Sequence, residues 1–406
     1  MLPQLALKNI LTFKKRSIIT LLLTAISTAL LVFASAFMGG SHSTMIRNAV
    51  ELYPGYLQIT GKGFRDTPSL EHIMVDIKPV REILLSQNEI EVFAERFETF
   101  VLFSSDEKAT GALLAGIEPE KEAHISRLKS SLTEGKYLSN VTTGQLYIGF
   151  ELAKKLRVGV GDSISYIGTG ADYSFAADNL TVVGIFMTGL YEFDGSSAFV
   201  PKSYFDSAMA SYNMASHIIV QPKFTEGAEQ LAQRLTTLLP DEFTAESWQE
   251  TMSGLVQAME LDSIFGYITL AIIFIVIFFV IMIYTLLGVF TRIREIGVLR
   301  AIGTTSNQVF ALLVLESTLL TLAGVLLGGV IGGLLAYYFE VHPLYFSGYE
   351  DQFKQYGLVQ SSLPTDFSPI AILRDMTIMF LLGVGCTIYP IFKILRYNPV
   401  EAMRHV

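Results

Sequence analysis

Residues 263–291, SIFGYITLAIIFIVIFFVIMIYTLLGVFT, contain no Asp, Glu, Lys or Arg. This run is longer than the ~20 apolar residues that a helix needs to cross a ~30 Å hydrocarbon core. Segments 18–38, 317–339 and 376–392 are also free of these four residue types. Only 17% of the chain is charged and its mean hydropathy is +0.45, whereas soluble domains carry about 25% charged residues. The sequence therefore predicts a polytopic membrane protein with four helical spans and excludes an ordinary soluble protein.

Charge is divided unevenly between the short and the long polar segments. Residues 1–16, 292–309 and 393–406 together carry ten Lys or Arg and two Asp or Glu, whereas residues 40–262 carry 17 and 30. Short basic segments beside spans stay in the cytoplasm, while long domains cross the membrane regardless of charge. We therefore expect both termini and the loop 292–309 in the cytoplasm, the large domain outside, and no nucleic-acid partner.

These two patterns together predict the domain organisation. The basic run before residue 18 and the sequence Ala34-Ser35-Ala36 resemble a signal peptide, but the apolar run exceeds the 7–15 residues of a signal core, so we expect a retained anchor. The predicted order is a cytoplasmic segment 1–16, transmembrane helix 17–39, extracytoplasmic domain 40–262, transmembrane helix 263–291, cytoplasmic helix and turn 292–309, transmembrane helix 310–339, extracytoplasmic loop 340–369, transmembrane helix 370–392 and cytoplasmic tail 393–406.

The large domain has the pattern of a mixed α+β fold. Alternating or buried apolar runs bounded by turn residues predict strands at 56–60, 113–117, 164–167, 180–186 and 216–220, the third and fourth forming a hairpin. Helical spacing predicts helices at 151–156 and 224–239, while 92–103 suits a strand or a helix. We expect a helix around 247–262 to continue into the second span. Cys386 is the only cysteine and lies in the last apolar segment, so this domain depends on a packed core rather than disulfides.

The sequence contains no enzyme signature. It has no H-E-x-x-H, no G-x-S-x-G and no paired cysteines, and its six histidines lack metal-ligand spacing. The stretch 55–63, GYLQITGKG, differs from a phosphate-binding loop in its glycine spacing and has no Ser or Thr directly after Lys62. We therefore expect no catalytic residue, no metal and no cofactor on this chain.

The loop 291–303, TRIREIGVLRAIG, has the features of a short amphipathic helix. Ile296, Leu299 and Ile302 fall on one helical face. Gly303 suits the position after a helix C-terminus, and Thr305 or Ser306 can cap a following helix. A generic basic loop that only obeys membrane topology is the alternative, but it needs neither a helix stop nor an apolar face.

The third span contains one carboxylate and a glycine pattern. Glu316 lies about one and a half turns from its start, where an ionisable group either points into a bundle or toward a partner, or reaches water at the interface. The glycines form overlapping small-xxx-small patterns, which favour close helix packing between spans or between protomers over a ligand site. They are Gly324, Gly328, Gly329, Gly332 and Gly333.

Two motifs resemble the FtsX/MacB/Lol superfamily of ABC-transporter permeases. One is Arg294-Glu295-Ile296-Gly297-x-x-Arg300-Ala301-x-Gly303, and the other is Asn398-Pro399-Val400-Glu401-Ala402-Met403-Arg404, with Met403 for the usual leucine. One span before the large domain and three after it also match this superfamily. Segments of the large domain resemble the lipoprotein-releasing (Lol) branch, namely 116–119, 134–136, 152–153 with 161–162, and 182–186 with 189–194.

The resemblance implies an assembly and a location. Permeases of this superfamily form dimers above two ATP-binding subunits, so it implies a second permease subunit, identical or homologous, and ATP with Mg²⁺ on the ATP-binding subunits. It implies a multi-pass protein of the bacterial inner membrane with a periplasmic domain. It assigns contact with the ATP-binding subunit to the loop helix, through Arg292, Arg294, Glu295, Ile296, Leu299, Arg300 and Gly303.

In the Lol branch, acyl chains of lipoproteins enter between the first and second spans and the protein passes to a periplasmic carrier. The corresponding cavity residues here are Phe33, Phe37, Met38, Ile264, Phe265 and Ile268; plain lipid-facing or packing roles are the alternative. The hairpin 166–179 corresponds to a carrier-recruiting element. Three functions remain open: lipoprotein extraction, MacB-like export of periplasmic peptides or amphiphiles, and FtsX-like mechanotransmission, against which the large outer domain counts.

Overall fold

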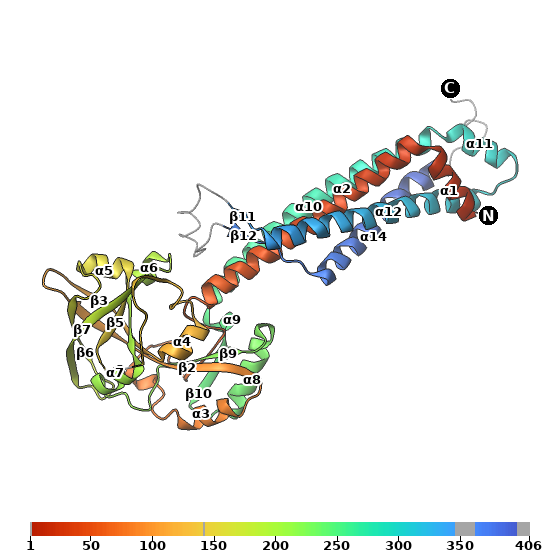
Figure 1. Cartoon of the computed structure of the whole chain (residues 1–406). Helices are drawn as coiled ribbons and strands as arrows, with labels where there is room; N and C mark the ends of the chain where they lie inside the picture. Colours follow the sequence, from red (N-terminus) through yellow and green to blue (C-terminus); the bar gives the residue numbers. More distant parts are fainter. Residues whose placement is uncertain (1, 141–142, 346–361, 396–406) are drawn as a thin grey trace. The chain divides into compact units, whose positions relative to one another are not determined.

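The computed structural model describes residues 2–140, 143–345 and 362–395 (Figure 1). The described residues divide into two compact units. The helical unit comprises 2–43, 259–345 and 362–395, and the sheet unit comprises 44–140 and 143–258.

Four helices, α2, α10, α12 and α14, are long and apolar enough to cross a membrane. The helices that contribute to the helical unit are α1 (Leu2–Thr12), α2 (Lys14–Val50), α10 (Ser253–Phe290), α11 (Ile293–Ala301), α12 (Ser306–Val341) and α14 (Pro369–Leu395). Two short strands, β11 (Leu344–Tyr345) and β12 (Ser362–Leu363), pair antiparallel between α12 and α14.

The helix bounds differ from the segments that hydropathy predicts. Helix α2 continues to Val50 rather than ending near 39, because polar residues such as Ser41 and Asn48 are compatible with a helix although they do not favour lipid. Helix α12 begins at Ser306 rather than 310 because a cap, not hydropathy, sets its start. Helix α10 begins at Ser253, so residues 253–262 continue into the second span without a break, as predicted. Only the start differs, since residues 248–251 form the separate helix α9 (Trp248–Thr251), which ends at Met252. Helix α1, within the segment 1–16, was not predicted.

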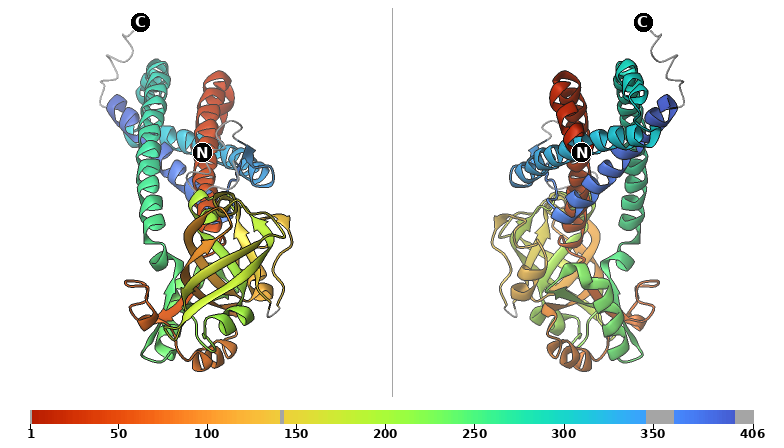
Figure 2. Two further views of the ribbon diagram at one scale, coloured as in Figure 1. Left: turned by 90° about the vertical axis from the view of Figure 1, so that its left-hand side faces the viewer. Right: turned by 90° about the vertical axis from the view of Figure 1, so that its right-hand side faces the viewer.

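Helices α2 and α10 run antiparallel along each other (Figure 2). Near one end, Gly288 of α10 faces Arg16 of α2, and near the other, Gly266 faces Met38. His42 Nε2 lies 2.8 Å from Asp262 Oδ2 at this second end. Helix α12 packs against both α2 and α14, and the apolar cluster at their centre includes Leu31, Val325 and Met379, with α10 contributing Leu270, Phe274 and Ile277.

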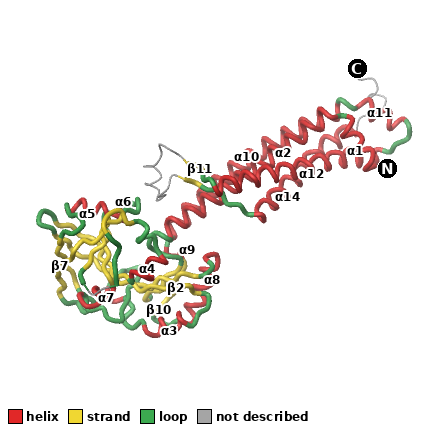
Figure 3. The backbone as a smooth tube through the Cα atoms, viewed as in Figure 1, coloured by secondary structure: helices red, strands yellow, loops and turns green. Residues whose placement is uncertain are grey.

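Ten strands of the described residues form the sheet of the sheet unit, drawn in yellow in Figure 3. They are β1 (Leu57–Gly61), β2 (Ile90–Ser104), β3 (Ala109–Ile117), β4 (Leu132–Gly135), β5 (Gln145–Gly149), β6 (Ser163–Thr169), β7 (Phe175–Phe186), β8 (Ser197–Pro201), β9 (His217–Pro222) and β10 (Phe243–Ser247). The order is β10-β1-β9-β2-β3-β8-β5-β7-β4, and β6 pairs with β2 and β7. The pairs β3/β8 and β5/β7 are parallel and the others antiparallel.

Strand β2 joins two lobes of this sheet. Its residues 90–96 pair with β9 and its residues 97–104 pair with β3. Each lobe has its own apolar core, one around Ile59 and Ile218, the other around Phe97 and Tyr166. The covering helices are α3 (Lys78–Leu85), α4 (Pro119–Ile125), α5 (Phe150–Leu156), α6 (Tyr191–Asp194), α7 (Lys202–Ala208), α8 (Ala228–Leu238) and α9, with 3₁₀ turns at Leu70–His72 and Thr225–Gly227.

The strand predictions for this unit are confirmed at 113–117, 164–167, 180–186 and 216–220, and the expected hairpin is the pair β6/β7. The ambiguous segment 92–103 is a strand, because each half pairs with a different neighbour and is buried against a different lobe.

Candidate functional site

The loop after α10 folds as the short helix α11, which ends in a defined C-terminal cap and is followed by a capped start of α12. Gly303 has φ +107°, and its N–H donates to the Arg300 carbonyl at 3.1 Å while that of Thr304 donates to Leu299 at 3.1 Å. This is a Schellman motif, which favours glycine because the left-handed conformation strains other residues. Thr305, rather than Ser306, then caps α12 in a capping box with Gln308. The predicted helix, glycine stop and capped restart are therefore confirmed.

The predicted apolar face of α11 is divided between two environments. Ile296 is 7% exposed and packs against Val309 and Leu313 of α12 and Ile391 of α14. Ile302, in contrast, is 79% exposed beyond the last helical turn. Ile296 therefore faces the chain's own helices, and its contact with an ATP-binding subunit stays a prediction.

The outward surface of α11 consists of other residues. Arg294, Glu295 and Val298 are exposed, and Leu299 and Arg300 are half-buried. Val298 and Ile302, four residues apart, lie on one side of the chain. A mixed charged and apolar surface of this kind suits contact with another protein.

Glu316 lies in the interior of the helical unit and not at a water-facing position. It is 3% exposed, and Arg292, itself 7% exposed, donates from Nη1 to both carboxylate oxygens at 3.0 and 2.9 Å. Arg16 Nη1 lies 3.8 Å from Glu316 Oε1. Arg292 Nε also donates to Glu295 Oε2 at 3.1 Å, and its guanidinium lies 4.7 Å from the Phe13 ring centroid. We call Arg16, Arg292 and Glu316 the inner charge cluster.

Sequence reasoning singled out Arg292 and Glu316 separately but missed Arg16 and the pairing. A signal was available, because a lone carboxylate inside a span needs a cationic partner. Arg16 directly precedes the first span and Arg292 directly follows the second, so both cations lie at one end of these antiparallel helices.

The glycines of α12 lie between helices of the same chain. Gly324, Gly328 and Gly332 face α2, where a Cβ on Gly332 would lie 2.9 Å from the Ala29 carbonyl oxygen. Gly329 and Gly333 face α14 and its preceding turn, through Met376, Ile372 and Phe367. Close backbone approach therefore explains the pattern, and both faces of α12 are used inside one protomer.

The candidate cavity residues fall into two groups. Phe33 stacks with Phe37 at 6.4 Å and meets Phe339 of α12 edge-on at 5.7 Å, while Met38 faces Gly266 of α10. Ile264, Phe265 and Ile268 are exposed along α10.

An apolar groove of about 290 Å³ runs between α2 and α12, that is, between the first and third spans. Phe33 belongs to it and is the residue that it shares with the predicted cavity. The groove is lined by Leu22, Ala25, Ile26, Ala29, Leu30, Phe33, Leu327, Ile331 and Leu335.

The hairpin β6/β7 contains the predicted recruiting segment 166–179. Tyr166 is buried in the core, whereas Ile167 and Phe175 are exposed. Ile167 pairs with Leu102 of β2, which is also exposed, as is Phe100. The outward face of these strands therefore carries exposed apolar side chains beside polar ones such as Ser165 and Asn179.

A second charge cluster is buried in the sheet unit where β2 passes between the lobes. Arg96 and Glu122, both 0% exposed, share hydrogen bonds of 2.9 and 2.6 Å, and Arg96 Nη1 donates to the Tyr53 carbonyl at 2.6 Å. Tyr53 in turn donates from its hydroxyl to Glu98 at 2.5 Å, and His217 Nε2 lies 3.2 Å from the same oxygen. Burial opposes the charge of Glu98, but His217 and the Tyr53 hydrogen bond outweigh it and lower the pKa of Glu98 to about 2.

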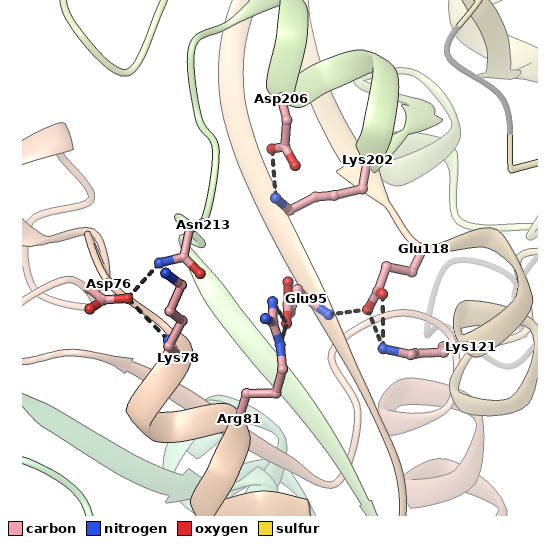
Figure 4. Close-up of polar contacts among 9 residues, drawn as sticks. All are labelled: Asp76, Lys78, Arg81, Glu95, Glu118, Lys121, Lys202, Asp206 and Asn213. Atoms are coloured by element: carbon pink, nitrogen blue, oxygen red, sulfur yellow. Dashed lines mark hydrogen bonds and ion pairs between the residues drawn. The ribbon is translucent and has the colours of Figure 1, made fainter.

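Further polar contacts surround this crossing point (Figure 4). Arg81 of α3 donates to Glu95 of β2, and the Glu95 N–H donates to Glu118 at the start of α4, which also binds Lys121. These contacts connect α3, β2 and α4.

The molecule is thus built as a membrane permease: four apolar helices, a large α+β unit between the first and second, and a short helix in the loop between the second and third. Residues 17–238 match the family described as MacB-like periplasmic core domain, and residues 267–399 match the FtsX-like permease C-terminal family. The chain belongs to the FtsX/MacB/Lol superfamily of ABC-transporter permeases. Its C-terminal motif 398–404 lies outside the described residues.

Curated relatives agree with this family. The lipoprotein-releasing system transmembrane protein LolC of Neisseria meningitidis serogroup B is 24% identical over 320 residues, which covers 73% of each chain. The uncharacterized ABC transporter permease YknZ of Bacillus subtilis is 23% identical over 431 residues, covering 99% of this chain and 98% of its own. The crystal structure of the periplasmic region of MacB from Actinobacillus actinomycetemcomitans aligns with 14% identity and a TM-score of 0.38, covering 52% of this chain and 95% of that one.

Family membership determines the general role. The chain is a membrane protein with a large extracytoplasmic domain. It is a permease component, and permeases of this kind work with an ATP-binding subunit.

Proposed function

We propose that this chain couples ATP hydrolysis on a separate subunit to the extraction of lipoproteins from the bacterial inner membrane toward a periplasmic carrier. The observations that carry the proposal are the exposed apolar surface of α10 and the apolar groove beside Phe33, which lies between α2 and α12. Removing an acyl chain from lipid costs about 0.8 kcal/mol per CH₂ unless an apolar wall replaces the bilayer. The similarity to LolC over 73% of the chain supports the same substrate class.

The proposed assembly contains two permease subunits, identical or homologous, and two ATP-binding subunits that carry ATP and Mg²⁺. The outward surface of α11, with Arg294, Glu295, Val298 and Ile302, is the proposed contact with the ATP-binding subunit. Because α11 is packed onto α12 and α14 through Ile296, a push on its outer surface moves the spans as well.

A double substitution tests this contact. Val298→Asp with Ile302→Asp places two charges on the exposed surface of α11 without disturbing its buried side, so the permease should insert normally but lose the ATP-binding subunit on co-purification. Val160→Asp, at an exposed valine of the sheet unit, is the matched control. Undiminished co-purification of the double variant would exclude α11 as the contact.

A photo-crosslinker tests the substrate. Placed at Phe37 or Phe265 in native membranes, it should capture a lipidated protein, and ATP turnover should reduce the yield by releasing the substrate. The same crosslinker at Leu381, exposed on α14, is the control and should capture phospholipid only.

MacB-like export of peptides or amphiphiles is the second candidate function, and the match of residues 17–238 to the MacB-like periplasmic core domain supports it. In that case Phe37 and Phe265 would capture only phospholipid, and unlipidated peptides or small amphiphiles would stimulate ATP hydrolysis.

A further inference from the structure

We propose that Glu316 is a positioning residue for coupling: its carboxylate exchanges between Arg292 and Arg16 and thereby passes movement of α11 to the foot of α2. This inference rests on the proposed contact of the ATP-binding subunit with α11. It goes further by naming the group inside the permease through which the movement is transmitted.

The cluster connects elements that must move together. Glu316 is on α12, Arg292 directly precedes α11, and Arg16 lies in the first turn of α2 against Gly288 of α10. The Phe13 ring, between α1 and α2, lies against the Arg292 guanidinium. One carboxylate therefore joins α2, α11 and α12 at a single point.

The carboxylate is shared unequally between its two arginines. Arg292 makes hydrogen bonds of 2.9 and 3.0 Å to it, whereas Arg16 is 3.8 Å away. Among the described residues, the buried Nε and Nη1 atoms of Arg16 have no hydrogen-bond partner. A movement of about 1 Å at the foot of α2 would bring Nη1 within hydrogen-bonding distance of Glu316.

The cluster can therefore adopt two arrangements, with Glu316 hydrogen-bonded either to Arg292 or to Arg16, and its net charge is the same in both. If α11 pivots about the apolar cluster at Ile296, Arg292 at its N-terminal end can leave Glu316, because Arg292 also binds Glu295 of the same helix at 3.1 Å. Glu316 is then left buried and uncompensated, which is costly at a low-dielectric site. The approach of Arg16 relieves that cost, so a displacement of α11 draws the foot of α2 toward α12. No proton needs to move.

The attachment of α11 does not depend on this ion pair. Ile296, Val309, Leu313 and Ile391 form an apolar cluster that holds α11 on α12 and α14. A variant without the Glu316 charge should therefore retain its fold and its contact with the ATP-binding subunit but transmit less movement.

The experiment uses the full permease with its ATP-binding subunit in proteoliposomes. Glu316→Gln keeps the side-chain shape and removes the charge. We expect co-purification and ATP hydrolysis to persist while substrate release per ATP hydrolysed falls about tenfold, the scale of a typical coupling free energy. Glu340→Gln, an exposed glutamate of the same helix, is the matched control and should change neither quantity.

A distance measurement tests the movement itself. Spin labels at Ile18 of α2 and Leu322 of α12, both exposed, should change separation on ATP binding in the wild-type complex and in Glu340→Gln, but not in Glu316→Gln. Arg16→Gln leaves the Arg292–Glu316 hydrogen bonds intact and should also abolish the change. It provides the test if Glu316→Gln does not fold.

Normal release per ATP hydrolysed and a normal distance change in both variants would overturn the coupling role of Glu316. Failure of the proposed function has a different signature. If the wild-type complex releases no lipoprotein but hydrolyses ATP, the label distances still decide the role of the cluster.

Discussion

Two buried arginine–carboxylate clusters among the described residues differ in how fully their polar atoms are hydrogen-bonded. In the sheet unit, Arg96 and Glu122 are 0% exposed, and Arg96 uses Nε and Nη2 for Glu122 and Nη1 for the Tyr53 carbonyl. The Tyr53 ring also lies 3.8 Å from the Arg96 guanidinium. In the inner charge cluster, one carboxylate serves two arginines, and Arg16 retains buried nitrogen atoms without a hydrogen-bond partner in the described structure.

The extent of hydrogen bonding distinguishes a cluster that holds its elements rigidly, which we call a static joint, from one that can rearrange. A fully satisfied buried network is rigid because any movement leaves a polar group unpaired in a low dielectric. A cluster with a spare donor near its acceptor can exchange partners at little cost. We therefore interpret Arg96–Glu122 as the static joint that holds the two lobes of the sheet unit together rigidly. We interpret the inner charge cluster as a site where ion-pair partners can exchange.

The largest expected effect comes from breaking the static joint. Arg96→Met leaves Glu122 buried without its cation, which should destabilise the sheet unit by about 3–5 kcal/mol. Urea-dependent proteolysis of the purified full-length chain in detergent measures this through the protease-resistant sheet unit.

The double variant Arg96→Met with Glu122→Leu is the control, because it leaves no unpaired charge and should recover most of the lost stability. A loss below about 1 kcal/mol in the single variant would show that this pair is exchangeable too, and the contrast between the clusters would fail.

The sequence was sufficient to predict the spans and the caps. Long charge-free runs and the Gly303–Thr305 turn depend on local chemistry, so 263–291 and the restart of α12 could be predicted without tertiary information. The orientation of Ile296 could not, because helical periodicity defines a face but not the neighbour that covers it. In the same way, the glycine pattern predicted close packing but not that its partners are α2 and α14 of the same chain.

The charge clusters were the least predictable part. Arg96, Glu122 and Tyr53 come from three separate segments, and their surrounding sequence resembles solvated surface as much as core. Whether a charged side chain is buried depends on pairing across the sheet, as with the passage of β2 from β9 to β3. Glu316 was recognisable from its place in an apolar run, since a membrane span leaves few alternatives to an internal partner.

A smaller effect, on pH dependence, tests whether the static joint extends to Glu98. The pKa of Glu98 is lowered to about 2 from its ordinary 4.5, despite the opposing effect of burial, by His217 and the Tyr53 hydrogen bond. A lowered folded-state pKa stabilises the fold fully above pH 4.5 and loses that contribution as the pH falls from 4.5 toward 2. The contribution is at most about 3 kcal/mol.

We therefore expect the stability of the sheet unit to depend less steeply on pH over this range in Glu98→Gln than in the wild type. Glu91→Gln, at an exposed position of β2, is the control and should keep the wild-type slope. Equal slopes in Glu98→Gln and Glu91→Gln would show that Glu98 lies outside the joint, which would then end at Tyr53.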